Sequence, residues 1–175
     1  TGAGELSLTG ANTYTGSTAI TNGAVVVSGS LSDATAVSVS EGTTYEIGAD
    51  DTVGSIAGGG VIKLGSSTLS VGGDNSSTEF SGVVSGTGSL TKTGSGVLTL
   101  SGSNTYSGQT SVTGGTLRIA NTEALGSGSS FSLDNGALSF AVSSSGDASD
   151  ALVLGSNGGV FDVDAGQSLA FSGVI

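Results

Sequence analysis

Residues 95–119 read SGVLTLSGSNTYSGQTSVTGGTLRI, and residues 3–27 read AGELSLTGANTYTGSTAITNGAVVV. The two stretches lie 92 residues apart and are identical at 11 of 25 positions. In both, apolar and polar residues alternate, as they do from Leu6 to Leu8 and from Leu98 to Leu100. A period of two is the pattern of a β-strand, and we find no apolar stripe with helical spacing. The two stretches therefore predict a repeated all-β unit.

The repeat extends beyond these stretches. Residues 80–84 read FSGVV and recur as FSGVI at residues 171–175, which lie 91 residues further on. We therefore expect one domain over residues 1–175, made of two tandem units, 1–91 and 92–175. Short strands in a repeat array, with no room for helical crossovers, are typical of a solenoid. At roughly 20–25 residues per coil, the chain would form about seven or eight coils of a parallel β-helix.

The composition favours this solenoid over other β-folds. The chain has 33 Gly, 33 Ser and 21 Thr, but no Pro. Proline would remove a ladder hydrogen bond from an internal strand, whereas glycine suits tight corners. A β-sandwich or an antiparallel barrel stays possible. However, Asn-Gly pairs, which favour hairpins, occur only at 22–23, 135–136 and 157–158, too few for a hairpin array.

The composition also excludes several functions. The chain has no His and no Cys, which excludes imidazole and thiolate metal sites, a Ser-His-Asp triad, a cysteine nucleophile and disulfides. Three Lys and Arg residues against 14 Asp and Glu cannot neutralise phosphates, so we expect no nucleic-acid partner and no anionic membrane surface. The sequence shows no transmembrane run and no signal peptide, so we expect a mature fragment. We expect no cofactor.

Polar residues of the repeat are the first candidates for a binding site. Asn12–Tyr14 and Asn104–Tyr106 repeat the sequence Asn-Thr-Tyr, which would form a ligand-binding edge in a functional interpretation. We expect them instead to form a coil corner, where Asn bonds to adjacent backbone and Tyr packs with its hydroxyl in water. We expect Lys92 to lie on a turn, with its ammonium group in water. Thr-x-Thr pairs at 13/15 and 91/93 do not recur in every coil, which argues against an ice-binding face.

Pairs of acidic residues are the second group of candidates. Asp50/Asp51, Asp147/Asp150 and Asp162/Asp164 offer the oxygen ligands that Ca²⁺ prefers. The repeated calcium-binding pattern G-G-x-G-x-D is absent, and residues 72–74 match it poorly, so we expect surface acids and no metal site. Paired carboxylates also carry out glycoside hydrolysis. With no Trp and little Arg to hold a sugar, we expect no enzyme.

Residues 86–119 read GTGSLTKTGSGVLTLSGSNTYSGQTSVTGGTLRI. This stretch closely resembles the passenger-associated transport repeat, also called the autotransporter-associated β-strand repeat, of Gram-negative type V secreted proteins. Val97 and Ser107 stand where that repeat usually has Thr. The first copy fits from Gly4 onward. The matching residues are Leu90, Lys92, Gly94, Gly96, Leu98, Leu100, Gly102, Asn104, Tyr106, Gly108, Thr110, Val112, Gly115 and Leu117, with Asn12, Tyr14 and Gly16 in the first copy.

The resemblance implies a fold, a location and a role. The fold would be a right-handed parallel β-helix. The location would be secreted or at the cell surface, anchored in the outer membrane through a C-terminal barrel that this chain lacks. The main partner would be that β-barrel translocator, part of the same polypeptide. The expected role is a β-helical stalk that promotes outer-membrane translocation and folding. The alternative is an adhesive virulence module that binds the host-cell surface or like molecules on other cells.

Overall fold

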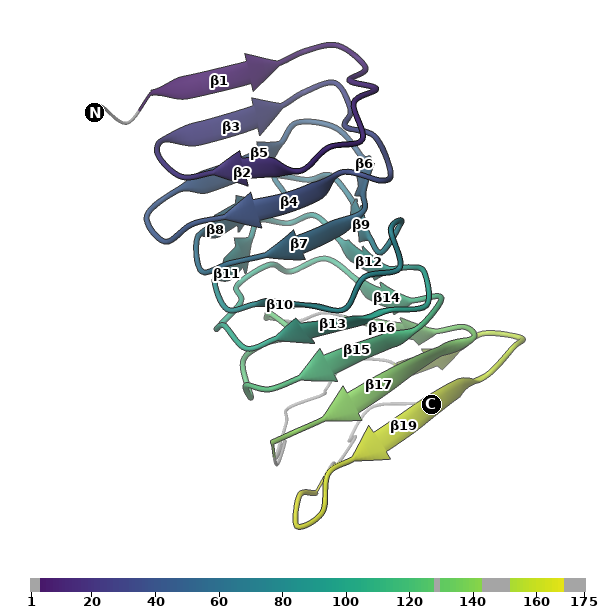
Figure 1. The fold of residues 1–175 in the computed structure, drawn as a ribbon. Helices are drawn as coiled ribbons and strands as arrows, with labels where there is room; N and C mark the ends of the chain where they lie inside the picture. Colours follow the sequence, from purple (N-terminus) through teal and green to yellow (C-terminus); the bar gives the residue numbers. More distant parts are fainter. Residues whose placement is uncertain (1–3, 128–129, 143–151, 169–175) are drawn as a thin grey trace.

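The computed structural model describes residues 4–127, 130–142 and 152–168. Every regular element in these ranges is a β-strand, and neighbouring strands pair in parallel. The chain winds as a β-solenoid of about seven coils, with the N-terminal coil at the top of Figure 1 and the C-terminal coil at the bottom. The described residues contain no helix of the length and apolarity needed to cross a membrane.

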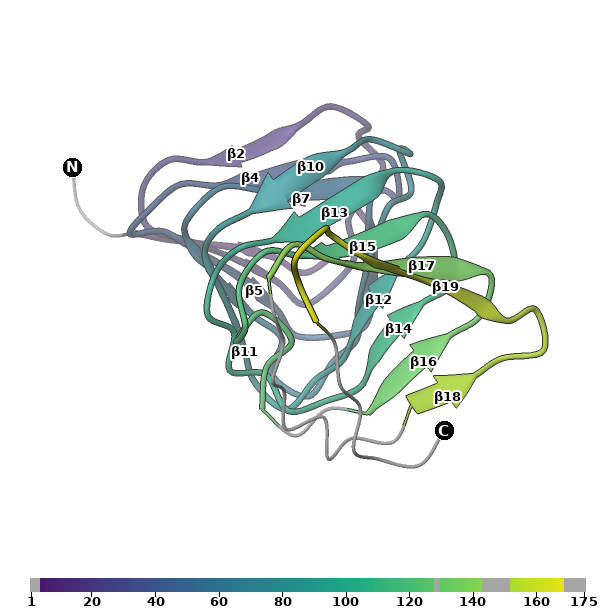
Figure 2. The ribbon, with the colours of Figure 1, turned by 90° about the horizontal axis from the view of Figure 1, so that it is seen from below.

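Three stacks of strands form three faces around one interior (Figure 2). Face 1 comprises β1 (Glu5–Leu8), β3 (Ala24–Val27), β5 (Thr44–Ile47), β8 (Val61–Lys63) and β11 (Val83–Ser85). Face 2 comprises β6 (Asp51–Val53), β9 (Leu69–Val71), β12 (Leu90–Lys92), β14 (Thr110–Val112), β16 (Phe131–Leu133) and β18 (Leu152–Leu154). Face 3 comprises β2 (Thr18–Ile20), β4 (Ala36–Val39), β7 (Ser55–Ala57), β10 (Thr78–Phe80), β13 (Val97–Leu100), β15 (Thr116–Ile119), β17 (Gly136–Phe140) and β19 (Gly159–Val163).

Backbone hydrogen bonds outside the strands complete two of the faces. A parallel bridge between Gly58 and Phe80 joins the upper part of face 3, which ends at β7, to the lower part. Below β11, face 1 is continued by the segment around Thr105, whose N–H donates to Val84 O at 2.9 Å. With the Gly58–Phe80 bridge and the Thr105–Val84 hydrogen bond, faces 1 and 3 continue beyond their last paired strands, and the solenoid keeps three sides there.

Strand register fixes the length of a coil. On face 2, Leu90 pairs with Thr110 and Thr110 with Phe131, so successive coils are offset by 20 and 21 residues. On face 1, Thr44 pairs with Val61, an offset of 17. The predicted parallel β-helix is confirmed, with about seven coils against the expected seven or eight. The number of residues per coil falls near or below the lower end of the predicted range, because each strand has only three to five residues.

The core consists of columns of side chains that point inward from equivalent positions in successive coils. Alternation places every second residue of a strand inside, as in β13, where Leu98 and Leu100 are buried and their neighbours are not. Face 2 contributes two such columns, which contain most of the buried polar residues discussed below. Column a is Asp51, Leu69, Leu90, Thr110, Phe131 and Leu152; column b is Val53, Val71, Lys92, Val112 and Leu133.

Candidate functional site

The second copy of the repeat forms the middle of the solenoid, and its characteristic residues point into the interior. Within residues 90–119, β12, β13, β14 and β15 supply the strands, and three glycine-containing corners join them. The predicted repeat residues with buried side chains are Leu90, Lys92, Leu98, Leu100, Asn104, Tyr106, Thr110, Val112 and Leu117. The structure therefore brings them together as core and inter-coil contacts rather than as an exposed site.

Asn104 connects three successive coils. Its side chain is 5% exposed. The amide oxygen Oδ1 accepts a hydrogen bond from Val84 N in the preceding coil, at 2.7 Å, and Nδ2 donates to Ala124 O in the next coil. Val84 belongs to β11, the last strand of face 1, so no further strand of that sheet accepts its N–H, and buried backbone groups need a partner. The predicted hydrogen bonds to backbone are thus present, but they reach the neighbouring coils and not the adjacent residues.

Tyr106 packs in the interior two residues further on. Its side chain is fully buried, and its hydroxyl lies 2.6 Å from Thr110 Oγ1 on column a. Burial raises the pKa of Tyr106 to about 12, and the hydrogen bond with Thr110 opposes that rise. The prediction of a hydroxyl in water is wrong for Tyr106, because the coil above and the coil below enclose the whole ring.

Lys92 is also buried, and the prediction that its ammonium lies in water is wrong. It occupies column b and is 1% exposed. Its Nζ donates to three backbone carbonyls at the corner: Thr93 O, Gly94 O at 3.1 Å and Gly114 O at 3.4 Å. Burial lowers the pKa of Lys92 from its ordinary value, and the negative charge of Asp74 acts in the opposite direction. The ammonium therefore links two coils by satisfying carbonyls that no strand partner reaches.

Repeat glycines allow the coils to stack closely at the corners. A Cβ on Gly96, Gly102 or Gly108 would lie 2.1, 1.9 or 2.2 Å from a carbonyl oxygen of the preceding coil. Gly94 and Gly115 have φ angles of +62° and +60°, which L side chains rarely adopt. These positions therefore need glycine for two separate reasons, close approach and backbone conformation.

The prediction of a surface acid is wrong for Asp51, which is buried beside Tyr45 near the top of the solenoid. Asp51 begins column a and is 6% exposed. Both of its carboxylate oxygens accept from Leu31 N at 3.2 Å, and further hydrogen bonds come from Thr52 N and the Tyr45 hydroxyl. Burial raises the pKa of Asp51, and these donors oppose the rise. The alternation in residues 51–53, which places Asp51 on the same side as Val53, was the signal that it points inward.

The other acidic residues of the predicted pairs that the structure describes, Asp50, Asp162 and Asp164, bind protein groups at the surface. Asp50 accepts from Thr68 N at 2.7 Å. Asp164 forms an ion pair with Arg118, with Nη2 and Oδ2 2.6 Å apart, and Ser139 donates to Asp162. Asp147 and Asp150 lie outside the described residues. In the described part of the chain, no three acidic side chains converge as metal ligands would.

Comparison with known protein families identifies the repeat. The model of the passenger-associated-transport-repeat matches residues 1–27 and 90–119, which contain the two aligned stretches 3–27 and 95–119. The chain carries two passenger-associated transport repeats. No curated protein and no solved structure matches the chain in the other comparisons.

The two passenger-associated transport repeats have the same internal geometry. Tyr14 repeats the contact of Tyr106, with its hydroxyl 2.7 Å from Thr18 Oγ1. Asn12 repeats the downward contact of Asn104, donating from Nδ2 to Ser30 O in the next coil at 3.0 Å. Both residues are more exposed than their counterparts because the first repeat forms the first described coil. Gly16 has no atom within 4 Å of an added Cβ, unlike Gly108.

The two passenger-associated transport repeats lie on different faces of the solenoid. Strand β1 of the first repeat lies on face 1, whereas β13, its counterpart in the second repeat, lies on face 3. Between them the chain completes four coils, marked on face 1 by β3, β5, β8 and β11, and then passes two further faces. The 92-residue spacing therefore corresponds to four and two thirds coils. Equivalent residues in the two repeats point outward in different directions.

Proposed function

We propose that this chain is a stalk segment of a type V autotransporter passenger, and that its repeats promote outer-membrane translocation and folding. The passenger repeats and the solenoid fit such a stalk, and passenger repeats imply a secreted or cell-surface location. The observation that supports the proposal most is that Lys92, Asn104 and Tyr106 contact other coils or the core instead of forming an exposed site. The partner in this proposal is the outer-membrane β-barrel of the same polypeptide.

The nearest-neighbour construction of the solenoid supplies a mechanism. In the described part of the chain, each strand pairs only with the strands of the coils directly above and below, so a coil that emerges from the barrel can dock on folded coils one at a time. Each docking step buries apolar columns and opposes backward sliding. The absence of Cys leaves no disulfide that would block an unfolded chain in the barrel. In this mechanism, Leu98→Asp on face 3 slows secretion.

An adhesive function receives less support from the geometry. Repeated adhesive contacts would need equivalent residues on one face, but the two repeats are rotated by one face relative to each other. We also propose that the segment has no catalytic activity, because Asp51 is surrounded by backbone and tyrosine donors, and the chain has no His or Cys to act beside it.

The test compares two deletions that each remove one coil in register. Leu90 pairs with Thr110, so deleting residues 90–109 joins Ser89 to Thr110 and preserves the face 2 register. Leu69 pairs with Leu90, so deleting residues 69–89 removes a coil outside the matched repeat in the same way. Both variants are made in the full-length autotransporter, and surface display and adhesion per displayed molecule are measured.

The proposal predicts that deleting residues 90–109 lowers surface display more than deleting residues 69–89, while adhesion per molecule persists. Equal display of the two variants would contradict a special role of the repeat in translocation and leave only the stalk. Normal display with lost adhesion after deletion of residues 90–109 would instead identify the repeat as the adhesive module.

A further inference from the structure

We propose that the corner after β12 is a binding site for a primary ammonium group, and that the side chain of Lys92 is its tethered occupant. The site is formed by the backbone carbonyls of Thr93 and Gly94 and by that of Gly114 in the next coil. An unbranched alkylammonium ion should therefore bind there when the Lys92 side chain is removed. The inference comes from the contacts of these residues and is independent of the proposed function.

The three carbonyl oxygens of the site are acceptors that the rest of the backbone leaves unfilled. In the described part of the chain, no backbone N–H donates to any of them. One coil above, Val71 stands in the place of Lys92 on column b, and there the carbonyl of Gly72 accepts from Asn75 N at 3.0 Å within its own turn. Backbone carbonyls that folding removes from water need a donor, and at the corner after β12 the ammonium group is that donor.

The number of acceptors and the local charge identify a primary ammonium as the occupant. An ammonium group on an alkyl chain has three N–H donors and no acceptor, which matches the three carbonyl oxygens around Lys92 Nζ. The negative charge of Asp74 favours the charged form of the group. Ca²⁺ takes about six to eight oxygen ligands and Mg²⁺ an octahedron of them, so three carbonyls suit either ion poorly.

The stem of Lys92 lies in an apolar space that would hold a short alkyl chain. Column b places Val71 above Lys92 and Val112 below it, and both valines are buried. Lys92→Ala removes the side chain beyond Cβ and leaves this space enclosed, because Lys92 is 1% exposed. An enclosed apolar space can take up a small molecule that fits it. The ion n-propylammonium contains the same heavy atoms that Lys92→Ala removes, so it can place its ammonium group at the three carbonyls.

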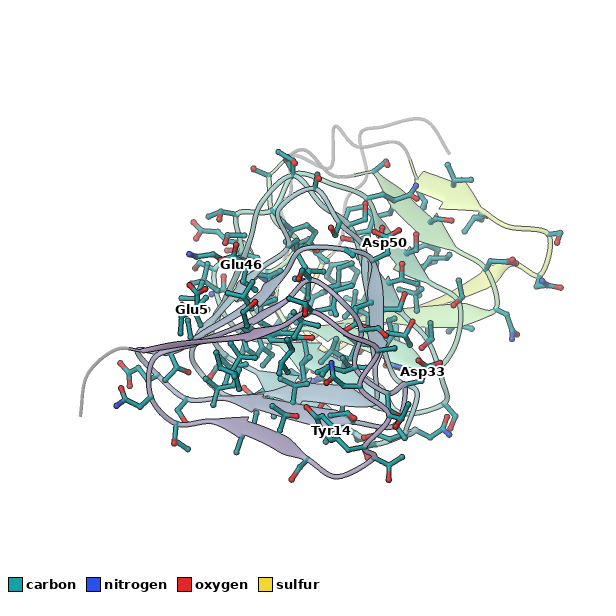
Figure 3. All side chains as sticks on the ribbon, turned by 90° about the horizontal axis from the view of Figure 1, so that it is seen from above. Glu5, Tyr14, Asp33, Glu46 and Asp50 are labelled. Carbon is teal, nitrogen blue, oxygen red and sulfur yellow. The ribbon has the colours of Figure 1, made fainter. Side chains whose placement is uncertain are left out.

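The test is urea denaturation of the purified chain at fixed ionic strength, with n-propylammonium as the probe. We expect the urea midpoint of Lys92→Ala to rise with probe concentration and then to saturate, because a ligand that binds only the folded state stabilises it. Lys92→Met fills most of the same space without a charge and should show no such rise. Lys63→Ala is the surface control, because Lys63 pairs with Glu46 on the outside of the solenoid (Figure 3) and its removal leaves no enclosed space.

Two further probes separate recognition of the ammonium group from the filling of space and from general effects of cations. The alcohol 1-propanol has the size of n-propylammonium but no charge, and tetramethylammonium has the charge but no N–H donor. Neither should reproduce the saturating rise in Lys92→Ala. An equal rise with 1-propanol would mean that the site only needs to be filled. An equal rise with tetramethylammonium would mean a general effect of cations on a chain with a net charge of −11. Either result, or a folded Lys92→Ala that does not respond to n-propylammonium, would overturn the proposal.

The variant Lys92→Cys keeps the proposal falsifiable if Lys92→Ala does not fold. The chain has no cysteine of its own, so alkylation of unfolded Lys92→Cys with 2-bromoethylamine restores an ammonium group at position 92 alone. We expect this product to recover the urea midpoint of the wild type. The same variant alkylated with iodoacetamide carries a neutral group instead and should stay below it. Equal midpoints for the two alkylated products would overturn the proposal.

Discussion

Leu98→Ala and Leu6→Ala remove the same side chain from equivalent positions of the two repeats, but we expect unequal losses of stability. Leu98 is 1% exposed between Thr78 of the preceding coil and Leu117 of the next, so its truncation leaves an enclosed cavity. Buried Leu→Ala changes cost about 2.7–5.0 kcal/mol, and we expect about 3 kcal/mol here. Leu6 is 54% exposed and no coil covers it, so we expect a loss of about 1 kcal/mol or less.

The assay is urea denaturation of the purified chain, followed by circular dichroism of the β-sheet. Equal denaturant slopes in the wild type and both variants show that the same cooperative unit unfolds. The end coil can fray separately from the rest in a nearest-neighbour solenoid, and hydrogen exchange of the β1 amides detects this. A loss at Leu6 as large as the loss at Leu98 would refute the reasoning, because it would mean that the first coil is as enclosed as the middle of the solenoid.

Three further variants test the buried polar residues by urea denaturation. Lys92→Met should lower the free energy of unfolding by about 1–3 kcal/mol, because three carbonyls lose their donor. The control Lys63→Met, at an exposed ion pair, should change the free energy of unfolding by less than about 0.5 kcal/mol. A similar loss of stability in both variants would contradict the role of Lys92. The pKa of Tyr106 is about 12 in the folded state against 10.0 in the unfolded state. Its contribution to the free energy of unfolding is therefore present below pH 10, and about 2–3 kcal/mol of stability is lost as pH rises through 12. Tyr106→Phe should lack that share of the alkaline decline, and an unchanged decline would show that the hydroxyl does not titrate as proposed. The pKa of Asp51 is raised in the folded state, so its contribution to the free energy of unfolding is present below pH 3.8 and is lost as pH rises through the folded pKa. Asp51→Asn should remove this pH dependence of stability. If the dependence persists in the variant, it belongs to other groups.

The fold could be predicted from the sequence because its determinants are local. Alternation at positions such as Leu98 and Leu100 identifies strands, and the 92-residue repeat identifies a solenoid. The rotation of the two repeats could not be predicted in the same way. It depends on the exact coil length, and an error of one or two residues per coil changes the face on which β13 lies.

The roles of the buried polar residues could be predicted only in part. The place of Lys92 depends on Gly114 O from a neighbouring coil, and that of Asp51 on Leu31 N, some 20 residues earlier in the chain. Local pattern reasoning treats a charged residue as exposed, because burial without partners is costly. In a solenoid the partners come from other coils at the corners, and their positions are known only when the register is known.

The three-sided cross-section has a consequence for how such a rod can grow. Because the first and second repeats fit equally well on different faces, a duplicated segment needs to contain a whole number of faces and not a whole number of coils. The spacing of four and two thirds coils amounts to fourteen faces. Duplication of such a unit would lengthen the rod by about 22 Å, at roughly 4.8 Å per coil, without disturbing the coils on either side. Passenger length can therefore change in small steps, while the repeat residues keep their places inside.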